Sequence, residues 1–262
     1  MTLEKELEIA ITAITEAGDI ILESRGHDLN VQLKQDGSPV TIGDKNSARY
    51  LTYVLTRSFP YGMLNEENIG NDTRRVHEYS WIIDPLDGTI SYINGDDGFG
   101  LIIGLVRGNT PVLGVTYRPL KDELCYSVKG EGAYIKNSCE DMRLRVNRSE
   151  EIDMLMTGYR KNEEMEDILR KIKPARARQM YTAFKTIEVA KGNANLFVCP
   201  RTVQMNLWDV CDTSAILEEA GGRMTDLYGR PIDFQGSADL RRGVVASNGL
   251  VHDYVVKCIG GR

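Results

Sequence analysis

The sequence is poor in the residues that build histidine or thiolate metal sites. Its 262 residues include only His27, His77 and His252, and no two of them form a closely spaced pair. This scarcity disfavours a histidine-based metal site and a Ser-His-Asp triad. The five cysteines are odd in number, widely spaced and without a C-x-x-C motif, which favours reduced thiols in a cytoplasmic protein. Carboxylates must then hold any metal, which favours magnesium, manganese or calcium.

Basic charge and long apolar runs are also scarce. The net charge of −6 disfavours nucleic acid as the main partner, although bound cations can still let an acidic protein take an anionic substrate. The most apolar run, residues 99–106, is too short to span a bilayer, and the acidic N-terminus lacks the apolar segment of a signal peptide. We therefore expect a cytoplasmic protein that partners neither nucleic acid nor membrane.

Apolar periodicity predicts an α/β fold. Helices are predicted at residues 3–24 and 44–57, and the runs between residues 98 and 128 read as consecutive strands of an antiparallel sheet. From about residue 148 the rhythm alternates between strands (153–159, 196–198, 243–247) and helices (162–171, 182–191, 207–220, 250–258). We therefore predict an α+β half over residues 1–147, an α/β half over residues 148–262, and an active site between them.

The most informative stretch is residues 84–89, DPLDGT, at the end of an apolar run. Strand ends are where α/β folds place their chemistry. Asp84 and Asp87 are separated by rigid backbone, so they can direct oxygens at one point, as hard divalent cations require. The Gly88–Thr89 pair can expose backbone N–H groups to an anion. A metal beside an anion indicates phosphate chemistry.

Three further acidic positions can join this chemistry, and each has a structural alternative. Asp209 and Asp44 each stand where a helix begins, so either could be a helix N-cap. The pair Glu66–Glu67 follows an apolar run, but acidic pairs in loops are commonly just solvated. Residue type alone leaves these alternatives open.

Taken together, these segments resemble the inositol monophosphatase superfamily of magnesium-dependent, lithium-sensitive phosphatases. Residues 84–89 match its D-P-[IL]-D-G-T signature, and W-D at 208–209 with E-A-G-G at 219–222 matches its second signature. The E-E pair at 66–67 and the segment S-P-V-T-x-x-D at 38–44 match as well. The resemblance covers nearly the whole chain. It implies a layered α/β/α/β/α sandwich and a homodimer.

The resemblance also implies a phosphomonoesterase that uses two or three Mg²⁺ ions per site, with Mn²⁺ as an alternative. Glu66, Asp84 and the backbone carbonyl of Leu86 would hold a first ion. Asp84, Asp87 and Asp209 would hold a second, so that Asp84 bridges the two. Two cations about 3.5–4 Å apart can offset the charge of a phosphate ester that would otherwise repel the nucleophile.

The catalytic roles follow from the same resemblance. Thr89, oriented by Asp44, would help Glu66 to position and deprotonate the attacking water. The amides of Gly88 and Thr89 would bind the phosphate oxygens, and Glu67 would support the metal ligands from behind.

The substrate is less clearly indicated. Thr202 stands where inositol-specific members carry a glutamate, which weakens an inositol-only reading. Lys185 and Arg201 resemble residues of the bacterial 3'-phosphoadenosine 5'-phosphate phosphatases, although a solvated helix lysine and a surface-loop arginine are the structural alternatives. Archaeal members often hydrolyse both inositol phosphate and fructose 1,6-bisphosphate. These three substrate classes stay open, and a non-catalytic regulatory binder of the same fold is a lesser alternative, disfavoured by the complete acid set.

Overall fold

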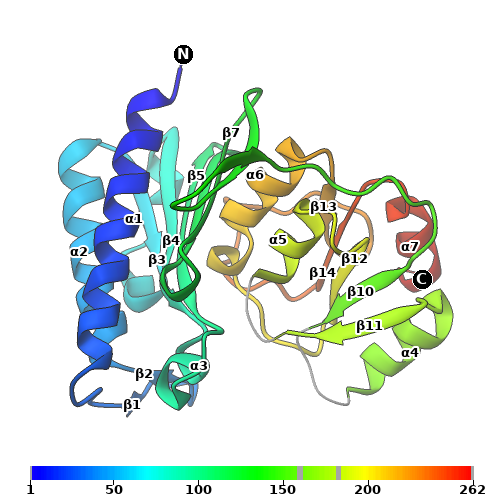
Figure 1. Ribbon diagram of the computed structural model, residues 1–262, viewed down its shortest axis with the longest axis horizontal. Helices are drawn as coiled ribbons and strands as arrows, with labels where there is room; N and C mark the ends of the chain where they lie inside the picture. The colour runs from blue at the N-terminus through cyan, green and yellow to red at the C-terminus, as the bar shows by residue number, and fades with distance from the viewer. Residues whose placement is uncertain (1, 158–161, 181–183, 261–262) are drawn as a thin grey trace.

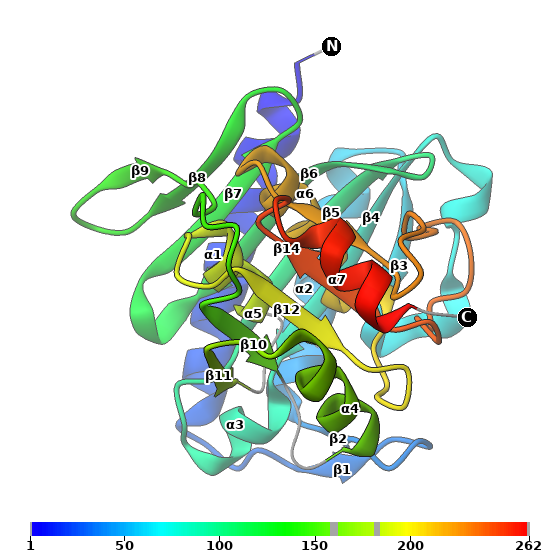
Figure 2. The same cartoon turned by 90° about the vertical axis from the view of Figure 1, so that its right-hand side faces the viewer.

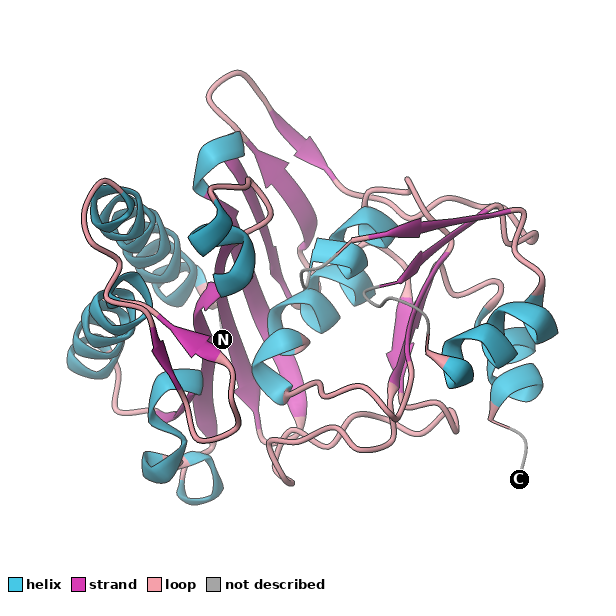
Figure 3. Ribbon diagram, turned by 90° about the horizontal axis from the view of Figure 1, so that it is seen from below, coloured by secondary structure: helices cyan, strands magenta, loops and turns pink. Residues whose placement is uncertain are grey.

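The computed structural model describes residues 2–157, 162–180 and 184–260, and in them helices and sheets alternate in five layers (Figure 1). Helices α1 (Glu4–Arg25) and α2 (Ile42–Ser58) form one outer layer against a seven-stranded sheet. A second helical layer separates this sheet from a five-stranded one, whose far side carries the last helical layer. Figure 3 shows the same succession from below. The expected α/β/α/β/α layering is therefore observed.

The two N-terminal helices form because each has one apolar stripe and a suitable start. Small and branched residues of α1, such as Ala10, Ile14 and Ile21, are fully buried against the sheet. Helix α2 begins after Thr41, whose hydroxyl caps the amides of its first turn in a capping box with Asp44. Both helices lie where the sequence predicts them.

The seven-stranded sheet has its strands in chain order, and it carries the first part of the functional site. Its strands are β3 (Gly62–Asn65), β4 (Tyr79–Asp87), β5 (Gly100–Arg107), β6 (Thr110–Arg118), β7 (Glu123–Val128), β8 (Gly132–Lys136) and β9 (Asp141–Arg143). All neighbours are antiparallel except β3 and β4, which are parallel. The antiparallel succession predicted from residue 98 onward is confirmed, and the parallel pair arises because residues 66–76 return the chain to the start of the neighbouring strand.

The five-stranded sheet mixes parallel and antiparallel pairs in the order β11-β10-β12-β14-β13. Its strands are β10 (Met154–Thr157), β11 (Arg176–Gln179), β12 (Leu196–Cys199), β13 (Arg223–Thr225) and β14 (Val244–Ser247). Helices α4 (Glu163–Ile172) and α7 (His252–Ile259) cover its outer face (Figure 2). Helices α5 (Phe184–Ala190) and α6 (Cys211–Glu219) lie between the sheets.

Several local expectations need correction. The short helix α3 (Thr89–Asn94) interrupts the run of strands, and the expected helix 207–220 breaks into a 3-10 turn, η4 (Leu207–Asp209), and α6. The expected helix start at Thr182 and strand end at 158–159 lie outside the described residues. Within the described ranges no helix is long and apolar enough to cross a membrane. A domain boundary at residues 147 and 148 stays a prediction.

Candidate functional site

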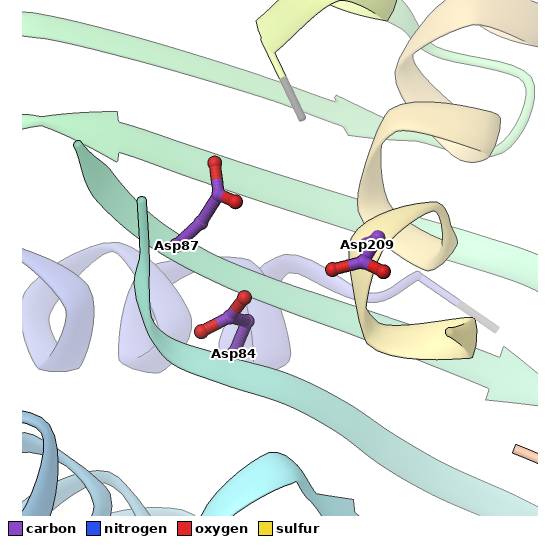
Figure 4. A group of neighbouring side chains, drawn as sticks. All are labelled: Asp84, Asp87 and Asp209. Atoms are coloured by element: carbon purple, nitrogen blue, oxygen red, sulfur yellow. The ribbon is translucent and has the colours of Figure 1, made fainter. Parts of the chain in front are cut away.

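Three aspartates from two separate parts of the chain converge at the end of β4. Asp84 pairs with β5 in register, and the register then shifts before Asp87, so the strand bulges at Pro85 and Leu86. Asp209 approaches from η4 on the opposite side (Figure 4). One carboxylate oxygen of each aspartate lies within 4.8 Å of the others. We call these three residues the acid cluster.

The acid cluster is electrostatically unfavourable by itself. Burial raises the pKa of Asp84 well above its ordinary range, and the Glu66, Asp87 and Asp209 carboxylates raise it further. Burial also raises the pKa of Asp209 to about 8, although a hydrogen bond from the Asn206 amide opposes the shift. Buried like charges need a compensating cation to ionise together. A cluster of carboxylate oxygens that needs positive charge to ionise fits a hard divalent cation, which prefers oxygen ligands.

The backbone of the bulge is fixed by hydrogen bonds around the acid cluster. The Leu86 amide donates to Asp84 Oδ1 at 3.0 Å, and the Ser47 hydroxyl donates to the Pro85 carbonyl at 2.8 Å. The Thr89 hydroxyl lies 3.2 Å from the Leu86 carbonyl oxygen. The Leu86 carbonyl, which is the predicted backbone ligand of a metal ion, therefore lies in the turn that joins the acid cluster to Thr89.

Asp44 joins this turn to α2. Its Oδ1 accepts a hydrogen bond from the Thr89 hydroxyl at 2.9 Å, and its Oδ2 accepts from the amide and the hydroxyl of Thr41. Burial raises the pKa of Asp44, while the bonds from Thr41 and Thr89 act in the opposite direction. The N-cap alternative is wrong for Asp44, because Thr41 holds that position and Asp44 is the third residue of the helix.

Glu66 and Glu67 begin the 3-10 turn η1 (Glu66–Asn71) that follows β3. Their side chains are only 23% and 12% exposed, so the solvated-loop alternative is wrong. The Lys34 ammonium lies 2.7 Å from Glu66 Oε1 and 2.6 Å from Glu67 Oε1. Sequence reasoning missed Lys34, because nothing local distinguishes it from other turn lysines. The Glu66 carboxylate acts electrostatically on Asp84, which joins it to the acid cluster.

The predicted anion-binding residues, Gly88 and Thr89, directly follow Asp87 of the acid cluster. Gly88 precedes α3 with a φ of 83°, a left-handed conformation that glycine adopts without strain. Thr89 is the first residue of α3, and backbone amides at a helix start lack partners inside the helix. The structure therefore brings Gly88 and Thr89 next to the proposed metal ligands.

The three predicted substrate contacts divide into two groups. Lys185 is only 3% exposed, so the solvated-helix alternative is wrong, and its Nζ lies 5.3 Å from the centre of the Phe197 ring. Burial lowers the pKa of Lys185, while the Asp87 and Asp209 carboxylates raise it, so its ammonium lies within electrostatic reach of the acid cluster.

Arg201 and Thr202 instead contact Glu164, a residue that sequence reasoning missed. Arg201 Nε lies 2.7 Å from Glu164 Oε1, and a further guanidinium N–H donates to the Tyr228 hydroxyl. The Thr202 amide and hydroxyl both donate to Glu164 Oε2 at 3.1 Å. The charge of Arg201 is therefore already offset within the protein.

Several known proteins resemble this chain in sequence or in structure over most of its length. A model of the inositol monophosphatase family matches residues 2–259. A fructose-1,6-bisphosphatase/inositol-1-monophosphatase from Aquifex aeolicus is 30% identical, with 97% of this chain and 95% of the relative covered. A 3'(2'),5'-bisphosphate nucleotidase from Haemophilus influenzae is 31% identical, with 79% of this chain and 78% of the relative covered. The solved inositol monophosphatase from Anabaena superposes with a TM-score of 0.82 at 27% identity, covering 99% of this chain and 97% of that structure.

Proposed function

The chain belongs to the inositol monophosphatase family of phosphatases, and we propose that it is a magnesium-dependent phosphomonoesterase acting on a small phosphate ester of the inositol monophosphate or fructose 1,6-bisphosphate type. The acid cluster is the observation that carries this proposal. Its three aspartates gather oxygens within 4.8 Å, Asp84 buried and the other two half-buried, where a cation would favour their joint ionisation. The relative from Aquifex aeolicus, which is named for both activities, supports the choice of substrate class.

The acid cluster and its neighbours divide into two proposed cation sites. Glu66, Asp84 and the Leu86 carbonyl hold one Mg²⁺ ion, and Asp84, Asp87 and Asp209 hold the other. When bound, such cations supply charge neutralisation for the phosphate and acidify a water molecule. Mg²⁺ is the expected metal because every donor is an oxygen and no described histidine is among them.

The remaining residues position the reactants. The Thr89 hydroxyl is held by Asp44 at 2.9 Å, so its oxygen can accept a hydrogen bond from the attacking water while Glu66 takes the proton. The amides of Gly88 and Thr89 bind the equatorial phosphate oxygens, over which the charge of the transferring group is spread. The protein therefore contributes orientation and a proton acceptor, and no covalent phosphoenzyme is needed.

A bisphosphate nucleotidase is the second candidate, and the burial of Lys185 favours it over an inositol monophosphatase. A buried ammonium beside the acid cluster would suit a substrate with a second anionic group. The relative from Haemophilus influenzae carries that activity in its name. Arg201 is a weaker candidate for the same role, because Glu164 already pairs with it.

Phosphate release in the presence of Mg²⁺ tests the reaction. Asp84→Asn should lower kcat by more than about a hundredfold, because losing even an outer partner of a metal ligand costs roughly 10–100-fold. Asp96→Asn is the matched control, since Asp96 is an exposed aspartate on the loop after α3. Turnover by Asp84→Asn equal to that of the control would refute the metal assignment.

A substrate panel tests the specificity. Inositol 1-phosphate, fructose 1,6-bisphosphate and 3'-phosphoadenosine 5'-phosphate should be compared by kcat/KM. A preference for the last that disappears in Lys185→Met but persists in Arg201→Met would establish the nucleotidase. Equal or better turnover of the first two would establish the inositol phosphate or fructose bisphosphate phosphatase. We also propose a homodimer, which sedimentation would test.

A further inference from the structure

Asp212 is a buried carboxyl group that the proposed reaction does not use. It lies in the first turn of α6, three residues after Asp209, and it is 0% exposed. The Thr116 hydroxyl donates a hydrogen bond to its Oδ2. Its Oδ1 has no hydrogen-bond partner among the described residues. Such an unpaired buried oxygen is unfavourable for folding, so stability alone does not explain a carboxyl group here.

The first turn of α6 lies directly on the backbone of the seven-stranded sheet. A Cβ atom added to Gly114 of β6 would come within 2.3 Å of the Asp212 carbonyl oxygen. A Cβ atom added to Gly104 of β5 would come within 2.4 Å of Cys211 Sγ. Two glycines therefore permit a helix–sheet approach that any larger residue would prevent.

Thr116 lies in the cross-strand row that contains Asp84. Asp84 of β4 pairs with Ile102 of β5, and Ile102 pairs with Thr116 of β6. Side chains of directly opposed residues lie on the same face of a sheet. The Thr116 hydroxyl is thus fixed to the same face and the same row as the Asp84 carboxylate.

We propose that Asp212 is a positioning residue for Asp209, acting through its hydrogen bond to Thr116. The bond holds the start of α6 against the row that carries Asp84, and Asp209 lies two residues before that helix. It therefore sets the separation between Asp209 and the two aspartates of β4, and with it the affinity for the second cation. This inference rests on the proposed two-cation function.

The geometry explains why one hydrogen bond can matter for the site. Asp84 and Asp87 belong to one strand, whereas Asp209 comes from η4, which lies against β4 and β5 and leads into α6. Its own local bond, from the Asn206 amide to Oδ2 at 2.6 Å, fixes its rotamer and not its distance from the sheet. Metal ligands must be held within about 0.5 Å of their working positions.

Calorimetric titration of the metal-free protein with Mn²⁺ tests the proposal. Asp212→Ala and Thr116→Val should each weaken the second Mn²⁺ binding step by roughly tenfold and leave the first step unchanged. The double variant should lose no more than either single variant, because both changes remove the same bond. Thr116→Ser keeps the hydroxyl and should restore the affinity. Ser127→Ala is the matched control, since it removes another buried hydroxyl from the same sheet.

Four results would overturn the proposal. Additive losses in the double variant would show that the two residues act separately. A loss in Ser127→Ala or Thr116→Ser equal to that in Thr116→Val would show a merely structural effect. Wild-type protein that binds no Mn²⁺ would overturn the proposed function and this inference with it, whereas wild-type binding that none of the variants changes would overturn the inference alone.

Discussion

The buried acids predict that the metal-free protein loses stability as the pH rises through neutrality. Burial raises the pKa of both Asp209 and Asp212 to about 8. In an unfolded chain an aspartate titrates near 4. Between about pH 4 and 8 the folded protein therefore holds protons that the unfolded chain has released, so the free energy of unfolding falls as the pH rises. The perturbation that isolates this effect is Asp209→Asn.

The expected size follows from proton counting. One full proton difference changes the free energy of unfolding by about 1.4 kcal/mol per pH unit. Between pH 6.5 and 7.5 a group with a pKa of about 8 stays mostly protonated, so Asp209 contributes a loss of about 1.2 kcal/mol. Burial lowers the pKa of His252 to about 4, whereas an unfolded histidine titrates near 6.5, so this group opposes the loss mainly below about pH 7. Its remaining contribution in the chosen window is the same in both proteins and cancels when they are compared.

Urea unfolding of chelator-treated protein at pH 6.5 and 7.5 measures the effect. Asp209→Asn should lose about 1.2 kcal/mol less than the wild type over this interval, and the comparison cancels the shared groups that do not interact with Asp209. Saturating Mg²⁺ should reduce the loss in the wild type, because the cation keeps Asp209 ionised. Asp96→Asn, which changes an exposed acid, should behave as the wild type. An equal loss in wild type and Asp209→Asn would refute the reasoning.

Three further changes test other parts of the site and its support. Thr89→Val removes the hydroxyl held by Asp44, so kcat for phosphate release should fall about a hundredfold while Mn²⁺ affinity measured by calorimetry stays unchanged; equal activity would refute the role. Lys34→Gln removes an ammonium that competes with a metal ion for Glu66, so the Mg²⁺ concentration that gives half-maximal activity should fall. A rise in that concentration would contradict the competition. Gly100→Ala places a Cβ 2.4 Å from the Phe184 ring, so calorimetry should show a melting temperature lower by at least about 2 °C, and no shift would contradict the packing.

The parts of the fold and site that were predictable are those with a local signal. The apolar stripe of α1 and the strand end at Asp84 each depend on residues close together in the sequence, and the structure confirms both predictions. Asp209 was identified by its resemblance to a signature, since nothing near it indicates that it meets β4. The roles of Glu66 and Thr89 stay predictions, although the structure places both beside the acid cluster.

The parts that were not predictable depend on contacts between distant segments. Strand β11 has four exposed residues without apolar alternation, and it exists only because its backbone pairs with β10. Lys185 reads as a surface helix lysine until α5 is placed between two sheets. Glu164 pairs with Arg201 although the two residues are far apart in the sequence, and no local sequence pattern indicates the contact. In each case tertiary packing decides, and the local sequence is compatible with another outcome.

The charges around the acid cluster suggest an order of binding. In the metal-free protein Lys34 neutralises Glu66, and the Lys185 ammonium lies within electrostatic reach of Asp87 and Asp209. Both lysines therefore offset the same carboxylates that the proposed cations would use. Bound cations take over that neutralisation, which leaves the lysine charges to act on an anionic substrate. Bound cations would then strengthen binding of the phosphate ester in two ways. They attract its negative charge directly, and they free the ammonium groups of Lys34 and Lys185 from the carboxylates. Metal first and ester second is the order that this exchange of charge favours.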